Sequence, residues 1–403
     1  MTEIDQPASA ASPASLSPPR VRVHRQLREH AHGIAGTEVR ARLAILCAWA
    51  GSRCIVIATA AIVEATGTPH GAAGVALDGR GPIAVLQAWD GRWYRTIATH
   101  GYLLMPGRQS DPAFFPLLPI VLRICHLVGL SYGIGSVVVS SVAFGIGLLA
   151  LYELVRTWLP QPIARRAAIY AAIFPMSFVF SMMYPEAIAF ALIALAGVFV
   201  TRRRWASCAA CAAAATLARP EGAILIIPIA AGAVQAWKSM PTAARGRAVG
   251  AVLSPVAALV GYSGYLWWSL GQPFAWTKAQ AAWGRSFHFT GVYAAILSLV
   301  TAARHHQGWL FRDAIFCLVF LVCLLVAWRA GVPRAWIVAG AAMVLLPPAS
   351  GIFTSDARFG LLALPIYPGL ACLARTRKID LGIRCVSIAL LIAGVEAIVL
   401  HWP

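Results

Sequence analysis

The amino-acid sequence predicts an all-α polytopic membrane protein, a bundle of about eleven transmembrane helices, and three observations indicate this fold class. Of the 403 residues, 59% are hydrophobic and only 12% are charged. Apolar runs recur along most of the chain, and the mean hydropathy is +0.72. A bilayer core of about 30 Å takes roughly 20 apolar residues per helix. The chain therefore has room for ten or more crossings and none for a large soluble catalytic domain.

The chain is expected to begin with a disordered cytoplasmic tail at residues 1–42. This segment is rich in Ala, Ser and Pro and lacks an apolar period. A transmembrane domain at residues 43–403 follows. Its first helix is expected at 43–63, where the apolar run is long enough to span.

Residues 64–135 are expected to form a large first extracytoplasmic loop. Up to about residue 115 this segment is too polar, and too rich in Gly, Pro and aromatic residues, to cross the bilayer. The run 115–130 is apolar but is interrupted by prolines, Arg123 and His126. We therefore expect interfacial helices in this loop, lying along the membrane surface.

Ten further apolar runs predict the remaining transmembrane helices. They cover residues 136–155, 167–183, 186–201, 205–218, 222–237, 249–270, 309–328, 336–350, 359–374 and 385–402.

The arginines predict the orientation of this bundle, because cytoplasmic loops carry an excess of Lys and Arg. With a cytoplasmic N-terminus, the loops on that side hold most of the 33 basic residues, including the cluster Arg202, Arg203 and Arg204. If residues 115–130 crossed the membrane, that cluster would lie outside. With residues 115–130 at the interface and the N-terminus in the cytoplasm, the other polar groups gather on the extracytoplasmic face. We therefore expect a multi-pass protein of the cell membrane with an extracytoplasmic polar cavity.

Several function classes are disfavoured by the sequence. The net charge of +18 comes from scattered basic residues and not from one stripe, so nucleic acid is not an expected partner. The pair Cys208-x-x-Cys211 has no second pair of ligands near it in the sequence, and neither have the two consecutive histidines His305 and His306. We therefore expect neither a metal nor a cofactor. There is no P-loop or dinucleotide fingerprint, which disfavours nucleotide-driven chemistry.

The segment Trp89-Asp90-Gly91-Arg92-Trp93-Tyr94-Arg95, which runs on to His100, is the densest candidate site. A carboxylate among aromatic rings suits a sugar, because the rings stack on its C–H faces and the carboxylate accepts a hydroxyl proton. The alternative is an interfacial aromatic belt in which Asp90 caps a short helix. The residues alone do not decide between the two.

Two Pro-Glu turns separate short apolar runs, one containing Tyr184 and Glu186 and the other Arg219 and Glu221. Helices of about 14 residues rise only about 21 Å, so these turns are expected to dip below the interface and line a cavity. The alternative is simple capping of the next helix by each glutamate.

Cations on the same face are candidates for binding a phosphate, since arginine offers a bidentate fork to its oxygens. They are Lys278, Arg285 and Arg358. The alternative is anchoring to lipid headgroups at the interface. Arg53, inside the first apolar run, has several open interpretations: it snorkels, pairs with a carboxylate or meets a lipid phosphate.

Six stretches of the chain resemble the bacterial relatives of PIG-V, the second mannosyltransferase of GPI-anchor synthesis. They are WDGRWYRTIATHGY (89–102), FFPLLPIVLR (114–123), YPEAIAFALIALAGVFVTRRRW (184–205), LARPEGAILIIP (217–228), GQPFAWTKAQAAWGR (271–285) and SDARFGLLALP (355–365). The resemblance implies a membrane glycosyltransferase of the GT-C class with an outward-facing active site. It also implies a lipid-linked donor, polyprenyl-phosphate-mannose, and a catalytic acidic residue that falls on Asp90. It does not identify the acceptor.

The chemistry of the residues agrees with this expectation. A lipid phosphate is already a good leaving group, so transfer needs one base, assigned to Asp90, and cations for the phosphate, assigned to Arg92, Lys278, Arg285 and Arg358. A single displacement inverts the configuration at the anomeric carbon. Besides membrane lipids and the donor, the partner is an acceptor that remains unidentified. The alternative function is a lipid or sugar transporter or flippase, disfavoured because no repeated halves are detectable.

Overall fold

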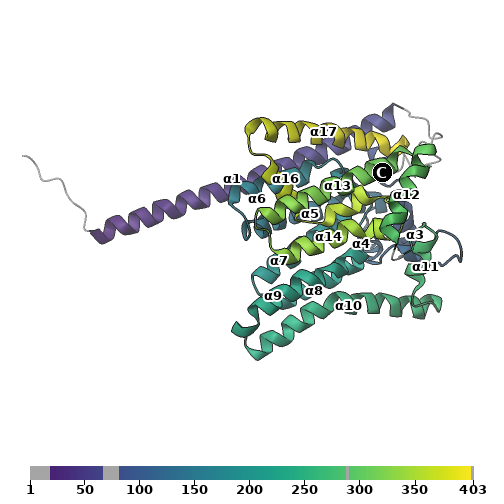
Figure 1. Ribbon diagram of the computed structural model, residues 1–403, viewed down its shortest axis with the longest axis horizontal. Helices are drawn as coiled ribbons and strands as arrows, with labels where there is room; N and C mark the ends of the chain where they lie inside the picture. The colour runs from purple at the N-terminus through teal and green to yellow at the C-terminus, as the bar shows by residue number, and fades with distance from the viewer. Residues whose placement is uncertain (1–18, 67–80, 287–289, 306, 401–403) are drawn as a thin grey trace, which may run out of the picture. The chain divides into compact units, whose positions relative to one another are not determined.

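The computed structural model of the protein describes residues 19–66, 81–286, 290–305 and 307–400 (Figure 1). Within these ranges every regular element is an α-helix or a 3-10 helix. This confirms the prediction of an all-α protein. The chain divides into two units, residues 1–43 and residues 44–403. The second unit contains the helical bundle.

Helix α1 (Pro19–Ala65) begins earlier than the sequence analysis expects. Residues 19–42 are helical where a disordered tail is predicted, and residues 1–18 lie outside the described part. The physical reason is composition, because Arg, Glu, Leu and Ala favour helix over this stretch and Pro19 stands at the first turn, where its missing N–H does no harm.

Six helical segments in the described part of the chain are long and apolar enough to cross a membrane. They are residues Gly36–Ala65 of α1, α5 (Tyr132–Arg156), the segment Pro220–Ser239, α10 (Thr242–Leu270), α13 (Gly308–Arg329) and residues Arg377–Ile398 of α17 (Arg377–Leu400). Shorter apolar helices accompany them, namely α4 (Leu117–Leu127), α7 (Glu186–Thr201), α8 (Trp205–Ala218), α12 (Gly291–Arg304) and α14 (Arg334–Ala349). The protein is thus a multi-pass membrane protein. The count of eleven crossings stays a prediction.

Most predicted helices coincide with observed ones, and α7 and α8 have the predicted bounds. Two predicted runs are broken. The run 167–183 becomes the end of α6 (Gln161–Ile173) followed by η2 (Ser177–Ser181), and the run 359–374 is divided among α15 (Asp356–Phe359), η5 (Gly360–Leu362) and α16 (Ile366–Leu373). Prolines at 175 and 365 lie at these breaks. Helices α11 (Ala275–Ala281) and α12 were not predicted.

Close packing orders the bundle: α5 packs on α7, α7 on α8, and α8 on α10 (Figure 1). Small residues at the contacts allow the helix backbones to approach this closely. A Cβ atom at Gly147 of α5 would lie 2.6 Å from the ring of Phe190 in α7. At Gly222, in η3 (Pro220–Leu225), a Cβ atom would lie 2.4 Å from the Ala215 backbone of α8.

The two ends of the bundle are formed by different segments. At one end, Arg202 pairs with Glu153 of α5 at 3.5 Å, and Arg203 donates to Ser239 at 3.0 Å. At the other end lie α3 (Asp90–His100), α11 and α12 (Figure 1). Helix α7 has 16 residues, so its first residue, Glu186, lies about 24 Å from the arginine cluster. The turns predicted to line a cavity are therefore far from the arginine-rich end.

Candidate functional site

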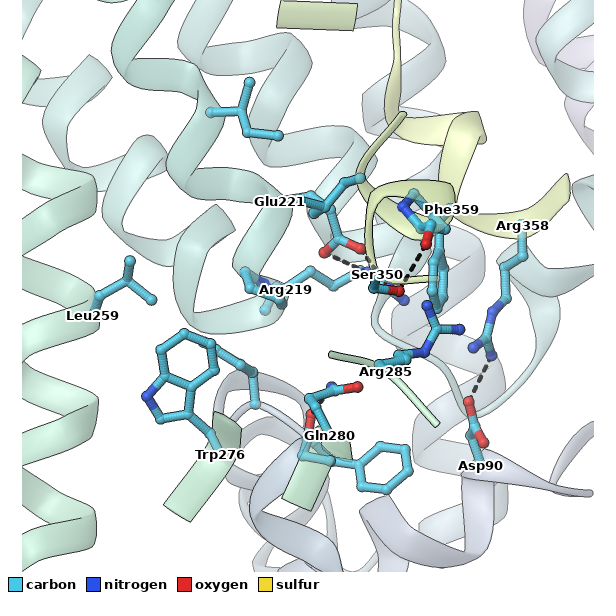
Figure 2. A pocket seen from close by; sticks show the side chains of 18 of the residues that line it. Asp90, Arg219, Glu221, Leu259, Trp276, Gln280, Arg285, Ser350, Arg358 and Phe359 are labelled. Atoms are coloured by element: carbon cyan, nitrogen blue, oxygen red, sulfur yellow. Dashed lines mark hydrogen bonds and ion pairs between the residues drawn. The ribbon is translucent and has the colours of Figure 1, made fainter. Parts of the chain in front are cut away.

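A cavity of about 280 Å³ lies among α3, α8, η3, α10, α11 and the segment that joins α14 to α15 (Figure 2). Its polar side chains include Asp90, Arg219, Glu221, Arg285 and Arg358. Its apolar walls are formed by residues that include Phe115, Leu259, Trp276, Leu346 and Pro347. The cavity therefore offers charge on one side and hydrocarbon on the other.

Asp90 is positioned by an unusual backbone conformation immediately before it. Trp89 has φ 60°, a value that a residue with a side chain rarely adopts. Its indole Nε1 donates to the Ile398 carbonyl at 2.8 Å, which anchors the turn to α17. The next residue, Gly91, packs on Met183, where a Cβ atom would lie 3.2 Å from the methionine Cβ. These contacts hold the carboxylate at the first turn of α3, facing the cavity.

Arg358 is positioned in a similar way. Ser355, which precedes α15, has φ 69°. Its backbone N–H donates to the Asp313 carboxylate of α13 at 2.7 Å, and Asp313 is fully buried. Strained backbone persists where surrounding contacts determine it, and such positions cluster at functional sites. Here a strained residue precedes each partner of the central ion pair.

An alternating chain of charges connects these segments. Arg358 Nη1 lies 2.7 Å from Asp90 Oδ2, and its Nε lies 3.3 Å from Glu186 Oε1. Arg219 Nη1 lies 2.6 Å from that same Glu186 oxygen. Arg219 also donates twice to Glu221, from Nε at 3.1 Å and from Nη2 at 2.8 Å. Glu186 is fully buried behind the cavity wall and joins the two arginines.

Phe359 separates the cationic groups. Its ring centroid lies 4.2 Å from the guanidinium carbon of Arg219, 4.8 Å from that of Arg358 and 4.9 Å from that of Arg285. Cations are attracted to the face of an aromatic ring. The ring thus lets three guanidiniums share one site.

Arg285 differs from the other two arginines in its partners. Its Nη2 donates to the Thr354 carbonyl at 2.7 Å. Among the described residues no carboxylate lies within ion-pair distance of it. Burial, reinforced by the neighbouring Arg358, lowers the pKa of Arg285 to about 10. The guanidinium remains charged at neutral pH, and a bound anion would stabilise it.

The structure brings Asp90, Tyr94, Arg219, Glu221, Arg285 and Arg358 to the cavity wall. Two further candidates lie just behind it: Glu186, and Tyr184, whose ring centroid is 4.9 Å from the Arg358 guanidinium carbon. Trp89 and Trp93 support the site without lining the cavity. Trp93 stacks on Phe114, with ring centroids 5.6 Å apart.

Three predicted candidates are not brought to the cavity: Arg92, His100 and Lys278. Helical periodicity explains this result. Asp90 and Tyr94, four residues apart on α3, face the cavity, which leaves Arg92 exposed on another side. On α11, Trp276 and Gln280 are also four residues apart and face the cavity. Lys278 lies between them on another side of the helix and donates a hydrogen bond to the Gln272 side chain. Arg92, Lys278 and His100 therefore do not line this cavity, and the roles predicted for them stay predictions.

Arg53 does not belong to the cavity. It donates to the Ser177 carbonyl at 2.9 Å and to the Ser181 hydroxyl at 2.7 Å, so it fixes η2 against α1. Of the three interpretations, none describes this role. Phe359, Trp276 and Gln280 line the cavity but were not singled out as single residues. Among the described residues no three His, Cys, Asp or Glu side chains are grouped to hold a metal; His306 lies outside them.

Comparison with family models and with curated proteins finds no match. Among solved structures, the chain is similar to ArnT from Cupriavidus metallidurans bound to undecaprenyl phosphate. The identity is 14% and the TM-score 0.48, over 86% of this chain and 63% of that one. It is also similar to the archaeal oligosaccharyltransferase AglB from Archaeoglobus fulgidus in complex with an inhibitory peptide and a dolichol-phosphate, at 12% identity and TM-score 0.44, over 89% and 56%. The chain spans less than two thirds of the length of either.

Proposed function

We propose that the protein is an inverting glycosyltransferase of the GT-C class, which transfers mannose from polyprenyl-phosphate-mannose to an acceptor hydroxyl on the extracytoplasmic face. The observation that carries the proposal is Arg285. This guanidinium lines the cavity with no carboxylate in ion-pair distance among the described residues, beside the Asp90–Arg358 pair. A cavity with this guanidinium on one side and hydrocarbon on the other suits an anionic lipid.

The phosphate of the donor is assigned to Arg285 and Arg358. Arg219 is not part of this pair, because it donates twice to Glu221 and also contacts Glu186, and both of these carboxylates are buried. Guanidinium forks bind phosphate oxygens in bidentate fashion and stabilise the charge that develops on a leaving phosphate. The isoprenoid end of the donor is assigned to the apolar wall around Phe115, Leu259 and Trp276.

Asp90 is assigned the role of general base. Its carboxylate takes the proton of the acceptor hydroxyl while the oxygen forms a bond to the anomeric carbon, and the bond from that carbon to the phosphate oxygen breaks. The electron pair of the broken bond stays on the lipid phosphate, and Asp90 keeps the proton. Attack from the side opposite the phosphate inverts the configuration.

Charge supports an extracytoplasmic site. The arginine cluster at Arg202–Arg204 lies about one length of α7 away from Glu186. The positive-inside rule places such a cluster in the cytoplasm, and hence the cavity near the outer surface.

Reconstituted protein tests the proposed function directly. Vesicles containing the protein and radiolabelled polyprenyl-phosphate-mannose are incubated with a lipid and polymer extract of the cell envelope as acceptor. We expect mannose to leave the lipid and appear on an acceptor, with the opposite anomeric configuration. Movement of intact labelled lipid between leaflets, without transfer, would instead establish a transporter.

A further inference from the structure

We propose that the donor phosphate takes Arg358 away from Asp90, so that the base becomes free only when the donor is bound. This inference rests on the proposed function and adds an order of events to it. Without donor, Asp90 is neutralised by Arg358 at 2.7 Å. With donor, the phosphate occupies that guanidinium and Asp90 turns to the acceptor.

The geometry of Arg358 favours such an exchange, because the guanidinium is held from two sides by different carboxylates. Its Nε faces Glu186, which is fully buried, and its Nη1 faces Asp90 at the cavity. The Arg358 side chain is 5% exposed, whereas the Asp90 side chain is 16% exposed. Asp90 is therefore the partner that can leave, while Glu186 keeps Arg358 in place.

Electrostatics gives the exchange its direction. A phosphate attracted by Arg285 enters a site in which a second cation, Arg358, is already paired with Asp90. The phosphate and Asp90 carry charge of the same sign and compete for one guanidinium. Once displaced, Asp90 has lost a cation and gained a neighbouring anion. Both changes favour uptake of a proton, which is what a base requires.

The backbone on both sides is expected to stay fixed during the exchange. Trp89 is anchored to Ile398, and Ser355 is anchored to Asp313. The motion is thus a rotation of the Asp90 side chain and not a loop rearrangement.

A double-mutant cycle tests the competition, with farnesyl phosphate as the probe and its affinity for detergent-solubilised full-length protein as the readout. Asp90→Asn removes the competing charge and keeps the shape, so farnesyl phosphate should bind about tenfold more tightly than to wild type. In the Arg358→Gln background the same substitution should give less than a twofold gain. Asp111→Asn, a carboxylate outside the cavity, is the matched control and should leave the affinity unchanged.

The outcomes separate this inference from the proposed function. A gain of equal size in both backgrounds would mean that Asp90 only repels the phosphate, and would overturn the inference while the function stands. Absence of farnesyl phosphate binding by wild type would overturn both. A second measurement needs no Arg358 variant: in the infrared difference spectrum, adding farnesyl phosphate should shift a carboxylate band that is missing in Asp90→Asn. An unshifted band contradicts the exchange.

Discussion

At the scale of single residues, Arg285 and Lys278 are two cations of one segment with different roles. Arg285 points into the cavity, whereas Lys278 bonds Gln272 at the surface. Replacing Arg285 by Gln should weaken binding of farnesyl phosphate by about tenfold or more, since a charge-assisted hydrogen bond is lost. Lys278→Gln is the matched control and should bind as wild type does. Titrating both variants with farnesyl phosphate measures the two affinities. An equal loss of affinity in both would contradict binding of the phosphate by Arg285.

Glu186 gives a prediction for stability. Its carboxylate neutralises two buried guanidiniums at once. Glu186→Gln leaves both with one anion fewer, and breaking a buried pair from one side costs about 3 to 5 kcal/mol. Thermal unfolding in detergent should show the loss. The partly exposed Glu153, paired with Arg156 and Arg202, is the control, because Glu153→Gln should cost no more than about 1 kcal/mol.

Sequence reasoning could identify these residues individually but not their pairing. Asp90 and Arg358 stand out as charges at the ends of apolar runs, and both line the cavity. They are 268 positions apart, and nothing in either motif indicates that they touch. The alternating chain through Glu186 and Arg219 depends on how four segments pack. That Arg92 and Lys278 do not line the cavity could not be foreseen, because the orientation of the short helices α3 and α11 was unknown.

At the scale of elements, the close packing of η3 on α8 predicts a sensitive position. A Cβ atom at Gly222 would meet the Ala215 and Thr216 backbone at 2.4 Å. Gly222→Ala should therefore shift η3 and the neighbouring Glu221, with lower stability and at least tenfold weaker farnesyl phosphate binding. Gly250→Ala in α10, where a Cβ atom has open space, should be neutral or slightly stabilising. Wild-type behaviour of Gly222→Ala would show that the turn is looser than its packing indicates.

The 3-10 helix η1 (Asp111–Ala113) carries a buried carboxylate that makes stability depend on pH. Burial raises the pKa of Asp111 to about 6 from its ordinary value of 3.8, against a hydrogen bond from the Leu103 N–H that lowers it. Protonated Asp111 therefore favours the folded state below about pH 4, and this contribution disappears as the pH rises through 6. Asp111→Asn should unfold with a flatter pH dependence and be more stable at pH 7 by about 1 to 2 kcal/mol. Melting curves between pH 4 and 8 check this; parallel curves for both proteins would contradict it.

At the scale of the whole molecule, the length of the apolar runs predicted the long helices well, because a helix that crosses a bilayer needs a long run of apolar residues. Helices α7 and α8 have the predicted bounds. The short element α11 was missed because it has only 7 residues. Helix α12 was missed although, with 14 residues, it is as long as α8. The cavity could not be predicted, because its walls come from contacts between distant segments.

The orientation of the bundle is also a prediction at this scale. The arginine cluster at 202–204 should face the cytoplasm, and the loop with Arg108 should face outward. Single cysteines placed at Arg203 and Arg108 in a protein without its native cysteines should be distinguished by a membrane-impermeant thiol reagent on intact cells. Labelling at 108 alone is expected, and labelling at 203 alone would reverse the topology.

The central claim is that Asp90 is the base of a sugar transfer in this cavity. The most direct measurement is the turnover of Asp90→Asn with polyprenyl-phosphate-mannose, beside Asp111→Asn as the second carboxylate on the same face. Because the amide keeps the shape but cannot take the proton, turnover should fall by about 10² or more while farnesyl phosphate still binds. Asp111→Asn should retain wild-type turnover. Near-normal turnover by a folded, ligand-binding Asp90→Asn protein would contradict the account.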